Sequence, residues 1–561
     1  MKPHIQKGKL QLISAVLVAG LVLTPVLASA STSRKLEIRP VPTSVSSRVA
    51  STSVLTVEGG TNNVLNLNPF AGGDQGVDLL YNSLMLTNPV NGVMSPELAT
   101  AFTAVNAKTL VFTIRHGVKW SNGANFTPAD VVFTFDMLKK YPALDTGGVW
   151  TQLSSISVSG SKVVFKLRTP NVPFGMTLSG VPIASRLVWS RVKDPTTFKN
   201  QHPVVTGPYT LGSYAPTKLV FKKNPKSFEA AQVQPENVAF VAGSSGAADQ
   251  LLIASGAYDF SYNEFPDVKT AYVGQNPAHN IYWFPPGGVI SLFMNLTQAP
   301  FSNASFRQGV SYAIDRSAVE NAALFGLESV APQTGLMLPG ETTWTSPAIP
   351  NHGLVTQNVS KATADFTKAG YKMQNGKLVG SNGQQVSFQI TVVAGWTDWD
   401  GAAQEIATEL NKLGMNVTLN ESSYNVWNDG NSNGTFQASI GSFGGNPNAY
   451  GTYNPQLNSA FSAPVNTPSF NNIERFKSPT VNHYLAELAG ATTPTRQLQW
   501  IHALTNVMYN LVPVVNLYYG GMWGLFSTRH WVGWPSAKNP YTTPATWNYS
   551  LLAIMMHVKK A

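Results

Sequence analysis

Apolar and polar positions alternate along this chain with two different periods. From Val289 to about Asn295 a run of mainly apolar residues predicts a strand, and Pro300 then marks a turn. Ser302 or Asn303 can cap the helix that follows. Four residues at helical spacing form its apolar face: Phe306, Val310, Ala313 and Ile314. The stretch predicts one strand–turn–helix packing unit.

Strand and helix patterns also alternate through the rest of the chain. Strands are expected at six apolar runs: Val54–Val57, Thr109–Ile114, Ser161–Leu167, Val386–Val393, Met415–Leu419 and Val514–Tyr519. Helices are expected within Leu79–Leu98 before a turn at Asn88–Gly92, after the caps Thr127 and Ser360, from about Asp400 to Leu413, and from Pro494. The predicted buried stripes are Val131, Phe135 and Leu138 in one helix, and Trp500, Leu504, Val507 and Leu511 in another. This alternation indicates α/β lobes.

Composition narrows the class of protein. Of the 561 residues 43% are hydrophobic and only 12% are charged, about half the usual charged share. Much of the polarity comes instead from Asn, Ser, Thr and Gln, which suits an exported protein that holds neutral polar ligands. The net charge is +10, but the basic residues are scattered. Nucleic-acid-binding proteins concentrate such residues in a patch, so no nucleic-acid partner is expected.

The N-terminus has the pattern of an export signal. Lysines precede an apolar run at Leu10–Leu27, and Ala28-Ser29-Ala30 has the form of a signal-peptidase site. A cleaved signal peptide is therefore expected at 1–30, followed by a flexible Ser/Thr/Val/Pro-rich linker at 31–53. An uncleaved anchor is the alternative, because the run approaches a bilayer-spanning length. The chain has no cysteine, hence no disulfide and no Cys-linked lipid anchor.

Several motifs resemble those of one known family. The stretch Gly288–Gly326 resembles the "lN…PF.d..vR.A...AiDR" segment of extracytoplasmic solute-binding proteins of the peptide/nickel class, family 5, which serve ABC importers. Further matches follow the family's order along the chain: Pro96–Ala99, Phe112–Arg115, Gly117–Gly123, Asp130–Phe133, Thr206–Tyr209, Gly370–Tyr371 and Val512–Tyr518. Each motif alone is an ordinary turn or strand, so the resemblance rests on their order and spacing.

The resemblance implies an architecture and partners. The fold would be α/β, two-lobed and periplasmic-binding-protein-like (class II, cluster C), with a hinge crossed twice. Lobe I would span 54–289 with an inserted subdomain at about 85–203, lobe II 290–510, and 511–561 would return to lobe I. Ligand would lie between the lobes and be passed unaltered to an ABC permease and its ATPase subunits. The protein would be an exported monomer, periplasmic or at the outer face of the membrane, without cofactor, metal or catalytic residues.

Two branches of the family suggest different ligands. Peptide-binding members hold the ligand's amino group with a carboxylate in a "W..DY..P" segment; here Phe443 replaces the Trp, Gly444 follows, and Asn446 is nearest to the acid. A neutral Asn is a weaker partner for a buried ammonium group. The run Gly395–Trp399 instead resembles the oligosaccharide-binding branch, and aromatic rings suit the apolar faces of sugars. Oligopeptides and oligosaccharides both remain open.

The other candidate ligand-binding residues fall into two groups. The aromatic candidates are Trp283, Trp396, Trp399, Tyr424 and Trp427. Each of the tryptophans could instead belong to the core. Gly72, Gly73 and Asp74 resemble a family loop that lies along the ligand, although a simple turn would look the same.

A secreted hydrolase of oligosaccharides or peptides is the main competing hypothesis, and a ligand sensor for a membrane receptor is a third. The chain has no HExxH, no GxSxG and no thiol nucleophile. Ser159/Lys162 and Ser190/Lys193 have SxxK spacing without partner motifs. The nine histidines are dispersed, so metal binding is not expected.

Overall fold

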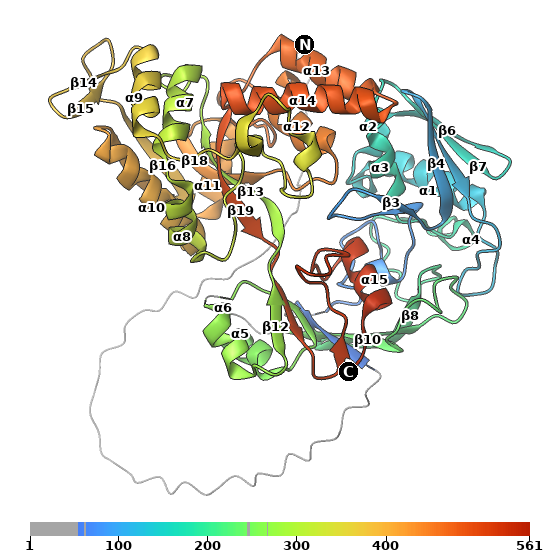
Figure 1. Cartoon of the computed structure of the whole chain (residues 1–561). Helices are drawn as coiled ribbons and strands as arrows, with labels where there is room; N and C mark the ends of the chain where they lie inside the picture. The colour runs from blue at the N-terminus through green and yellow to red at the C-terminus, as the bar shows by residue number, and fades with distance from the viewer. Residues whose placement is uncertain (1–53, 61–62, 244–246, 266) are drawn as a thin grey trace, which may run out of the picture. The chain divides into compact units, whose positions relative to one another are not determined.

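The computed structural model describes residues 54–60, 63–243, 247–265 and 267–561 (Figure 1). One part of the fold is built on a seven-stranded sheet. Its strands, in spatial order, are β12 (Asn280–Trp283), β20 (Gly524–Ser527), β11 (Phe260–Tyr262), β1 (Val54–Gly59), β10 (Asn237–Ala242), β9 (Lys218–Lys223) and β8 (Tyr209–Ala215). The sheet therefore combines segments from near the start of the described chain, its middle and its end.

The second part of the fold is built on a five-stranded sheet. Its order is β17 (Asn416–Ser422), β16 (Ser387–Val393), β18 (Ala438–Phe443), β13 (Pro286–Met294) and β19 (Val514–Gly521). Strands β16, β17 and β18 are parallel, whereas β13 runs antiparallel to both of its neighbours. Side chains of β13 alternate between two cores: Leu292 and Met294 enter one, and Phe293 enters the other. A central strand that is buried on both faces explains the mainly apolar run at 289–294, which only Ser291 interrupts.

Helices cover the five-stranded sheet on both faces. The core of Leu292 also contains side chains of α7 (Ala304–Ala313), α8 (Arg316–Leu324), α9 (Val359–Lys368) and α10 (Thr397–Lys412). The core of Phe293 contains side chains of α12 (Ala449–Leu457), α13 (Pro479–Gly490) and α14 (Pro494–Leu511).

A four-stranded antiparallel sheet forms an insertion between β1 and β8. Its order is β4 (Ala99–Asn106), β5 (Thr109–Ile114), β7 (Lys162–Leu167) and β6 (Leu153–Ser159). Helix α1 (Pro128–Lys140) packs on it. The predicted cap is confirmed: Thr127 N and Oγ1 both donate to Asp130 Oδ2, at 2.9 and 3.0 Å. The predicted stripe of Val131, Phe135 and Leu138 is buried.

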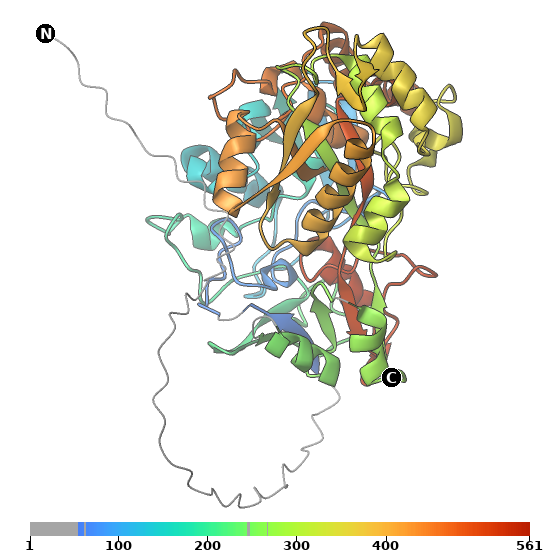
Figure 2. The same cartoon turned by 90° about the vertical axis from the view of Figure 1, so that its left-hand side faces the viewer.

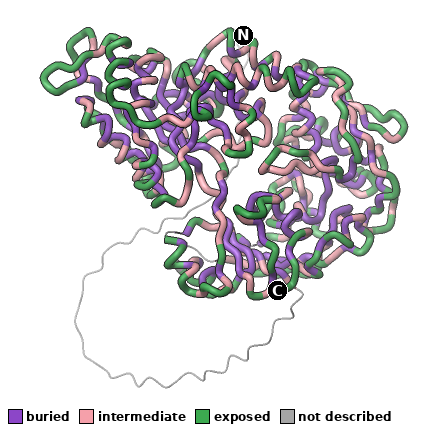
Figure 3. The backbone as a smooth tube through the Cα atoms, in the orientation of Figure 1, coloured by how far each residue is buried: buried purple, intermediate pink, exposed green. Residues whose placement is uncertain are grey.

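The chain crosses between the seven- and five-stranded sheets twice. Strand β12 ends at Trp283 and β13 begins at Pro286, while β19 ends at Gly521 and β20 begins at Gly524. The green β13 and red β19 lie side by side in Figures 1 and 2 and pair from Pro286 to Phe293. Both are buried over most of their length (Figure 3). The expected two-lobed α/β fold with a doubly crossed connection is confirmed.

The remaining elements are short or peripheral. Three two-stranded sheets pair β2 (Met85–Thr87) with β3 (Met94–Pro96), β14 (Lys372–Gln374) with β15 (Lys377–Val379), and β21 (Trp531–Val532) with β22 (Lys559–Lys560). The other helices are α2 (Val149–Gln152), α3 (Phe174–Ser179), α4 (Arg186–Trp189), α5 (Ala247–Ser255), α6 (Val268–Ala271), α11 (Tyr424–Asn433) and α15 (Asn548–His557). Among the described residues no helix combines the length and apolarity needed to cross a bilayer. The predicted signal peptide and linker lie outside the described residues.

The helix predicted within Leu79–Leu98 is wrong. After a short 3-10 turn at Val77–Leu79 the chain is irregular until β2. Its backbone bonds to distant segments instead, because Leu84 N donates to Ser179 O at 2.9 Å and Leu80 O accepts from Gly207 N at 2.9 Å. The predicted turn at Asn88–Gly92 is confirmed between β2 and β3.

Two other helix predictions need correction. The cap of α9 is Asn358 rather than Ser360, since its side chain accepts from Lys361 N at 2.9 Å. In α14 Leu504 is buried as predicted, but Leu511 is exposed. The buried face of that helix is Ile501, Leu504, Thr505 and Met508.

Arg307 and Arg316, the two arginines of the family-like segment, are buried structural donors. Arg307 donates to Val512 O, Phe301 O and Leu511 O at 2.7–2.8 Å, and so satisfies carbonyls at the C-terminus of α14. Arg316 donates to Asn516 O and to both the carbonyl and the hydroxyl of Ser311. These arginines therefore join the helices of this lobe to β19 and to the residues that precede this strand.

Candidate functional site

Two of the predicted groups, the aromatic residues and the loop after Phe443, contribute to one edge of the five-stranded sheet. Strands β16, β17 and β18 are parallel, so their carboxyl ends lie along the same edge. Trp396 follows β16, Tyr424 follows β17, and the loop 444–446 follows β18. In open α/β sheets ligands bind in the crevice outside these carboxyl ends. We call this the carboxyl edge.

Four aromatic side chains form a continuous cluster at the carboxyl edge. Trp396 lies 4.7 Å from Trp399 and 5.9 Å from Tyr424 between ring centroids, and Trp427 lies 5.4 Å from Trp399 and 5.7 Å from Tyr424. The angle between the Trp396 and Tyr424 rings is 33°. The structure thus brings together four of the five aromatic candidates.

The four rings divide into an inner and an outer pair. Trp399 is only 7% exposed and belongs to the lobe's core, and Trp427 is fixed by donating from Nε1 to Ser439 Oγ at 3.0 Å and to Ile440 O at 3.1 Å. Trp396 and Tyr424, in contrast, are 42% and 50% exposed. The inner pair fixes the outer pair, which presents aromatic surface to solvent.

Helix α10 begins earlier than the sequence pattern predicts, at Thr397 rather than about Asp400. Its first turn therefore contains Asp398 beside the aromatic cluster. Burial raises the pKa of the Asp398 carboxyl. Burial, and secondarily the charge of Asp398, raises the pKa of Glu264, which follows β11 in the other lobe. Carboxyl groups of both lobes thus lie close enough to interact near this edge.

Tyr518 lies on β19, the strand that leads to the connection between the lobes. Its ring is buried in the core, and its hydroxyl has no hydrogen-bond partner among the described residues. Burial raises its pKa well above the usual range, and the charges of Asp398, Glu320 and Glu264 add to the effect. The strand that leads to the connection between the lobes thus carries a buried, neutral hydroxyl.

The loop after β18 lines a separate cavity of about 300 Å³. Phe443, Gly444 and Asn446 all contribute to it. Phe443 also packs against the backbone at Gly335, where a Cβ would lie 2.7 Å from the ring, so Gly335 is required there. The Asn446 side chain donates from Nδ2 to Gly451 O at 3.0 Å.

Gly72, Gly73 and Asp74 lie elsewhere, in a cavity of about 360 Å³ that Trp547 also lines. A Cβ on Gly73 would lie 2.8 Å from Asn68 O, so close backbone packing requires glycine. The Asp74 carboxylate accepts from Asn66 N at 2.9 Å. This loop is therefore held by its own hydrogen bonds, and the structure does not join it to the aromatic cluster.

Trp283 is not in the cluster either. It lies in β12 opposite Gly524 and is half-buried against the core of the seven-stranded sheet. Its contacts are those of a packing residue in that sheet.

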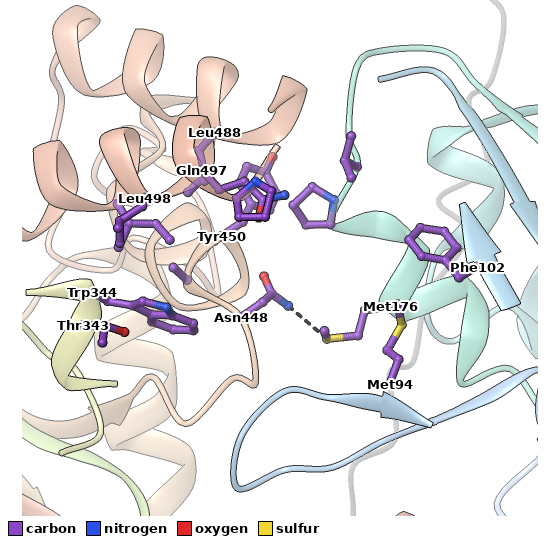
Figure 4. A pocket seen from close by; sticks show the side chains of 15 residues that line it. Met94, Phe102, Met176, Thr343, Trp344, Asn448, Tyr450, Leu488, Gln497 and Leu498 are labelled. Carbon is purple, nitrogen blue, oxygen red and sulfur yellow. Dashed lines mark hydrogen bonds between the residues drawn. The ribbon is translucent and has the colours of Figure 1, made fainter. Parts of the chain in front are cut away.

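A further cavity of about 460 Å³ lies between the insertion and the helices of the five-stranded lobe (Figure 4). Met94, Phe102 and Met176 line one side of it, and Trp344, Tyr450 and Leu488 line the other. Asn448 Nδ2 contacts Met176 Sδ across it at 3.3 Å. Sequence patterns did not indicate this cavity, because its two walls come from segments more than 150 residues apart.

The described part of the chain contains no group of three or more His, Asp or Glu side chains arranged to hold a metal ion. The edge instead offers aromatic rings, amides and carboxyl groups. These groups can bind a polar organic solute by stacking and hydrogen bonding.

A two-lobed α/β fold with a doubly crossed connection between the lobes is that of a solute-binding protein. The model of the bacterial extracellular solute-binding proteins, family 5 Middle, matches residues 93–463. The chain belongs to this family, as its motifs predicted. It is 26% identical to Protein XP55 of Streptomyces lividans over 438 residues, 75% of each chain.

Solved structures show the same fold. The periplasmic oligopeptide-binding protein of an oligopeptide ABC transporter from Thermotoga maritima superposes with a TM-score of 0.81 at 24% identity, over 91% of this chain and all of that one. A mannohexaose-bound structure of that Thermotoga protein gives a TM-score of 0.72 at 25% identity, over 91% of this chain and 99% of that one. The family is one of extracytoplasmic binding proteins, which supports solute binding over the hydrolase hypothesis.

Proposed function

We propose that this chain is the substrate-binding subunit of an ABC importer and that it captures short neutral oligosaccharides. The observation that carries the proposal is the outer pair of rings, Trp396 and Tyr424, held half-exposed at the carboxyl edge by Trp399 and Trp427. The C–H faces of a sugar ring pack on such rings while carboxyl and amide groups bind its hydroxyls. The mannohexaose-bound relative supports this class of ligand.

Binding would need no chemistry on the ligand. Sugar would stack on Trp396 and Tyr424, with Asp398 in reach of its hydroxyls, and the other lobe would close over it about the β13/β19 connection. We place the lobe boundaries near residues 289/290 and 510/511 and the insertion at about 85–203. The complex would then dock on a membrane permease with its ATPase.

Oligopeptides are the second candidate, because the Thermotoga relative is named for them. Asn446 argues against a peptide amino terminus at the position predicted from the family. Its amide offers no charge to compensate a buried ammonium group, and its Nδ2 is already used within the loop. We further propose that the protein acts as a monomer outside the cytoplasm after removal of residues 1–30.

Calorimetric titration of the purified protein tests the proposal. We expect saturable binding of at least one neutral hexaose among manno-, cello-, xylo- and maltohexaose, with the sugar recovered uncleaved. Trp396→Ala should weaken that binding about tenfold. Tyr214→Ala, an exposed aromatic on β8, is the control and should bind as wild type does. Binding of tripeptides alone, or cleavage of any sugar, would overturn the proposal.

A further inference from the structure

The 300 Å³ cavity beside the loop 443–446 has an unusual lining. Its walls are aromatic, aliphatic, hydroxyl and amide groups, and none of its described lining residues is Asp, Glu, Lys, Arg or His. Its volume lies at the lower end for small-molecule sites, which is room for a single ring rather than for a chain of them. The cavity adjoins the carboxyl edge, since Phe443 ends β18.

Phe470 forms an aromatic wall of this cavity. Its side chain is 70% exposed, although it is a large apolar group. Exposed aromatic surface at the rim of a polar cavity is what a stacking ligand covers. Nothing in the sequence pattern marked Phe470, because it lies in a loop without periodicity.

The polar groups of the cavity present hydrogen-bond acceptors. The Gln456 amide is anchored by donation from Nε2 to Glu474 Oε1 at 2.6 Å, as Asn446 is anchored to Gly451 O. In the described structure the carbonyl oxygens of both amides have no hydrogen-bond partner, and neither has the Thr452 hydroxyl. Two acceptors and a hydroxyl therefore line one small space, and their natural partners are hydroxyl donors.

We propose that this cavity is a subsite that receives one uncharged hexose ring of the bound oligosaccharide. The inference rests on the proposed function and adds to it a specific place for one ring of the sugar. The ring would stack on Phe470 and donate its hydroxyls to Asn446, Gln456 and Thr452. A uronic acid carboxylate would lose its hydration there without meeting a cation, so the subsite would reject it.

Titration of wild-type protein and two cavity variants with β-1,4-linked mannohexaose tests the subsite. Phe470→Ala removes the stacking wall, and Thr452→Val removes the hydroxyl at nearly constant shape. Each should raise Kd by about fivefold to tenfold with an unchanged melting temperature. Phe325→Ala is the matched control, because Phe325 is 76% exposed and does not line the cavity. Hexamannuronate of the same linkage should bind wild type at least about a hundredfold more weakly.

The outcomes separate the subsite from the proposed function. Wild-type affinity in both cavity variants, or equal binding of mannohexaose and hexamannuronate, would overturn the subsite and leave the proposed function standing. If wild type binds mannohexaose and only the cavity variants lose affinity, both are supported. If wild type binds neither mannohexaose nor any other neutral hexaose, both the proposed function and the subsite are overturned.

Discussion

Gly92 packs directly on the carbonyl group of Pro447. A Cβ built on Gly92 would lie 2.0 Å from Pro447 O, and Gly92 has a φ of +69°. Gly92 belongs to the turn between β2 and β3 and Pro447 to the loop before α12, so the contact joins the insertion to the five-stranded lobe. Val172 N donates to Ala489 O at 2.7 Å in a second such contact. The two lobes in this structure therefore touch through backbone atoms, which cannot move aside as a flexible side chain could.

Gly92→Val should force the two lobes apart at this contact. We expect Kd for the oligosaccharide to rise by about tenfold or more, because closure would no longer be complete. Small-angle scattering should show a smaller decrease in radius of gyration on adding ligand than wild type shows.

Gly117→Val is the control for this substitution. Gly117 has a similar φ of +79°, but a Cβ there would have no atom within 4 Å. Both variants carry the same backbone strain, so only Gly92→Val should affect ligand binding. Equal affinities for the two variants would contradict a role for this contact in closure.

Replacement of Trp399 by Ala should cost much more stability than replacement of Trp396. Trp399 is a core residue, so Trp399→Ala should lower the free energy of unfolding by about 3–5 kcal/mol. Trp396→Ala removes a half-exposed ring and should cost about 1 kcal/mol or less in stability. Denaturant unfolding of both variants measures the difference. A larger stability loss for Trp396→Ala would show that its ring is structural.

The protein should be more stable at weakly acid than at weakly alkaline pH. Burial raises the pKa of Glu97 to about 8, with the charge of Glu229 as a further cause, and burial raises the pKa of Glu229 to about 7. The folded state thus binds protons more tightly than the unfolded state, whose glutamates titrate near 4.5. The stabilisation is full below about pH 4.5 and is lost as pH rises through 7 and 8.

Melting curves between pH 5 and pH 8.5 check this prediction, with a fall of roughly a few degrees expected over that range. Seven other glutamates have pKa values raised in the same sense: Glu58, Glu264, Glu320, Glu328, Glu341, Glu409 and Glu474. Glu97→Gln, which has no titrating carboxyl, should make the melting temperature less dependent on pH. A melting temperature that rises towards pH 8.5 in wild type would refute the assignment.

Arg307→Lys should destabilise the fold despite keeping the charge. The planar guanidinium reaches three carbonyl groups in different directions, and an ammonium group cannot reproduce that geometry. We expect a loss of about 2–4 kcal/mol in unfolding free energy, since buried carbonyls lose their donors. Arg496→Lys, at an exposed ion pair with Glu487, should cost less than about 1 kcal/mol. Similar losses for both variants would argue against the capping role of Arg307.

Local signals in the sequence determined much of the fold. The strand Thr109–Ile114 and the start of α1 after Thr127 were predicted at their observed residues, because caps and two-residue alternation act over a few neighbours. The irregular segment after Leu79 was not predictable in this way. Its backbone partners are Ser179 and Gly207, which lie far away in sequence.

The sequence by itself also determined the family and the aromatic candidates Trp396 and Tyr424. Only the tertiary structure decided that these rings stand at the carboxyl edge with Trp399 beneath them, since three parallel strands from separate segments must align first. It alone placed Phe470 at the rim of a cavity without charged walls and set Gly92 against Pro447. The spacing of apolar residues indicates which face of a helix or strand is buried, whereas contacts between distant loops depend on how whole elements pack.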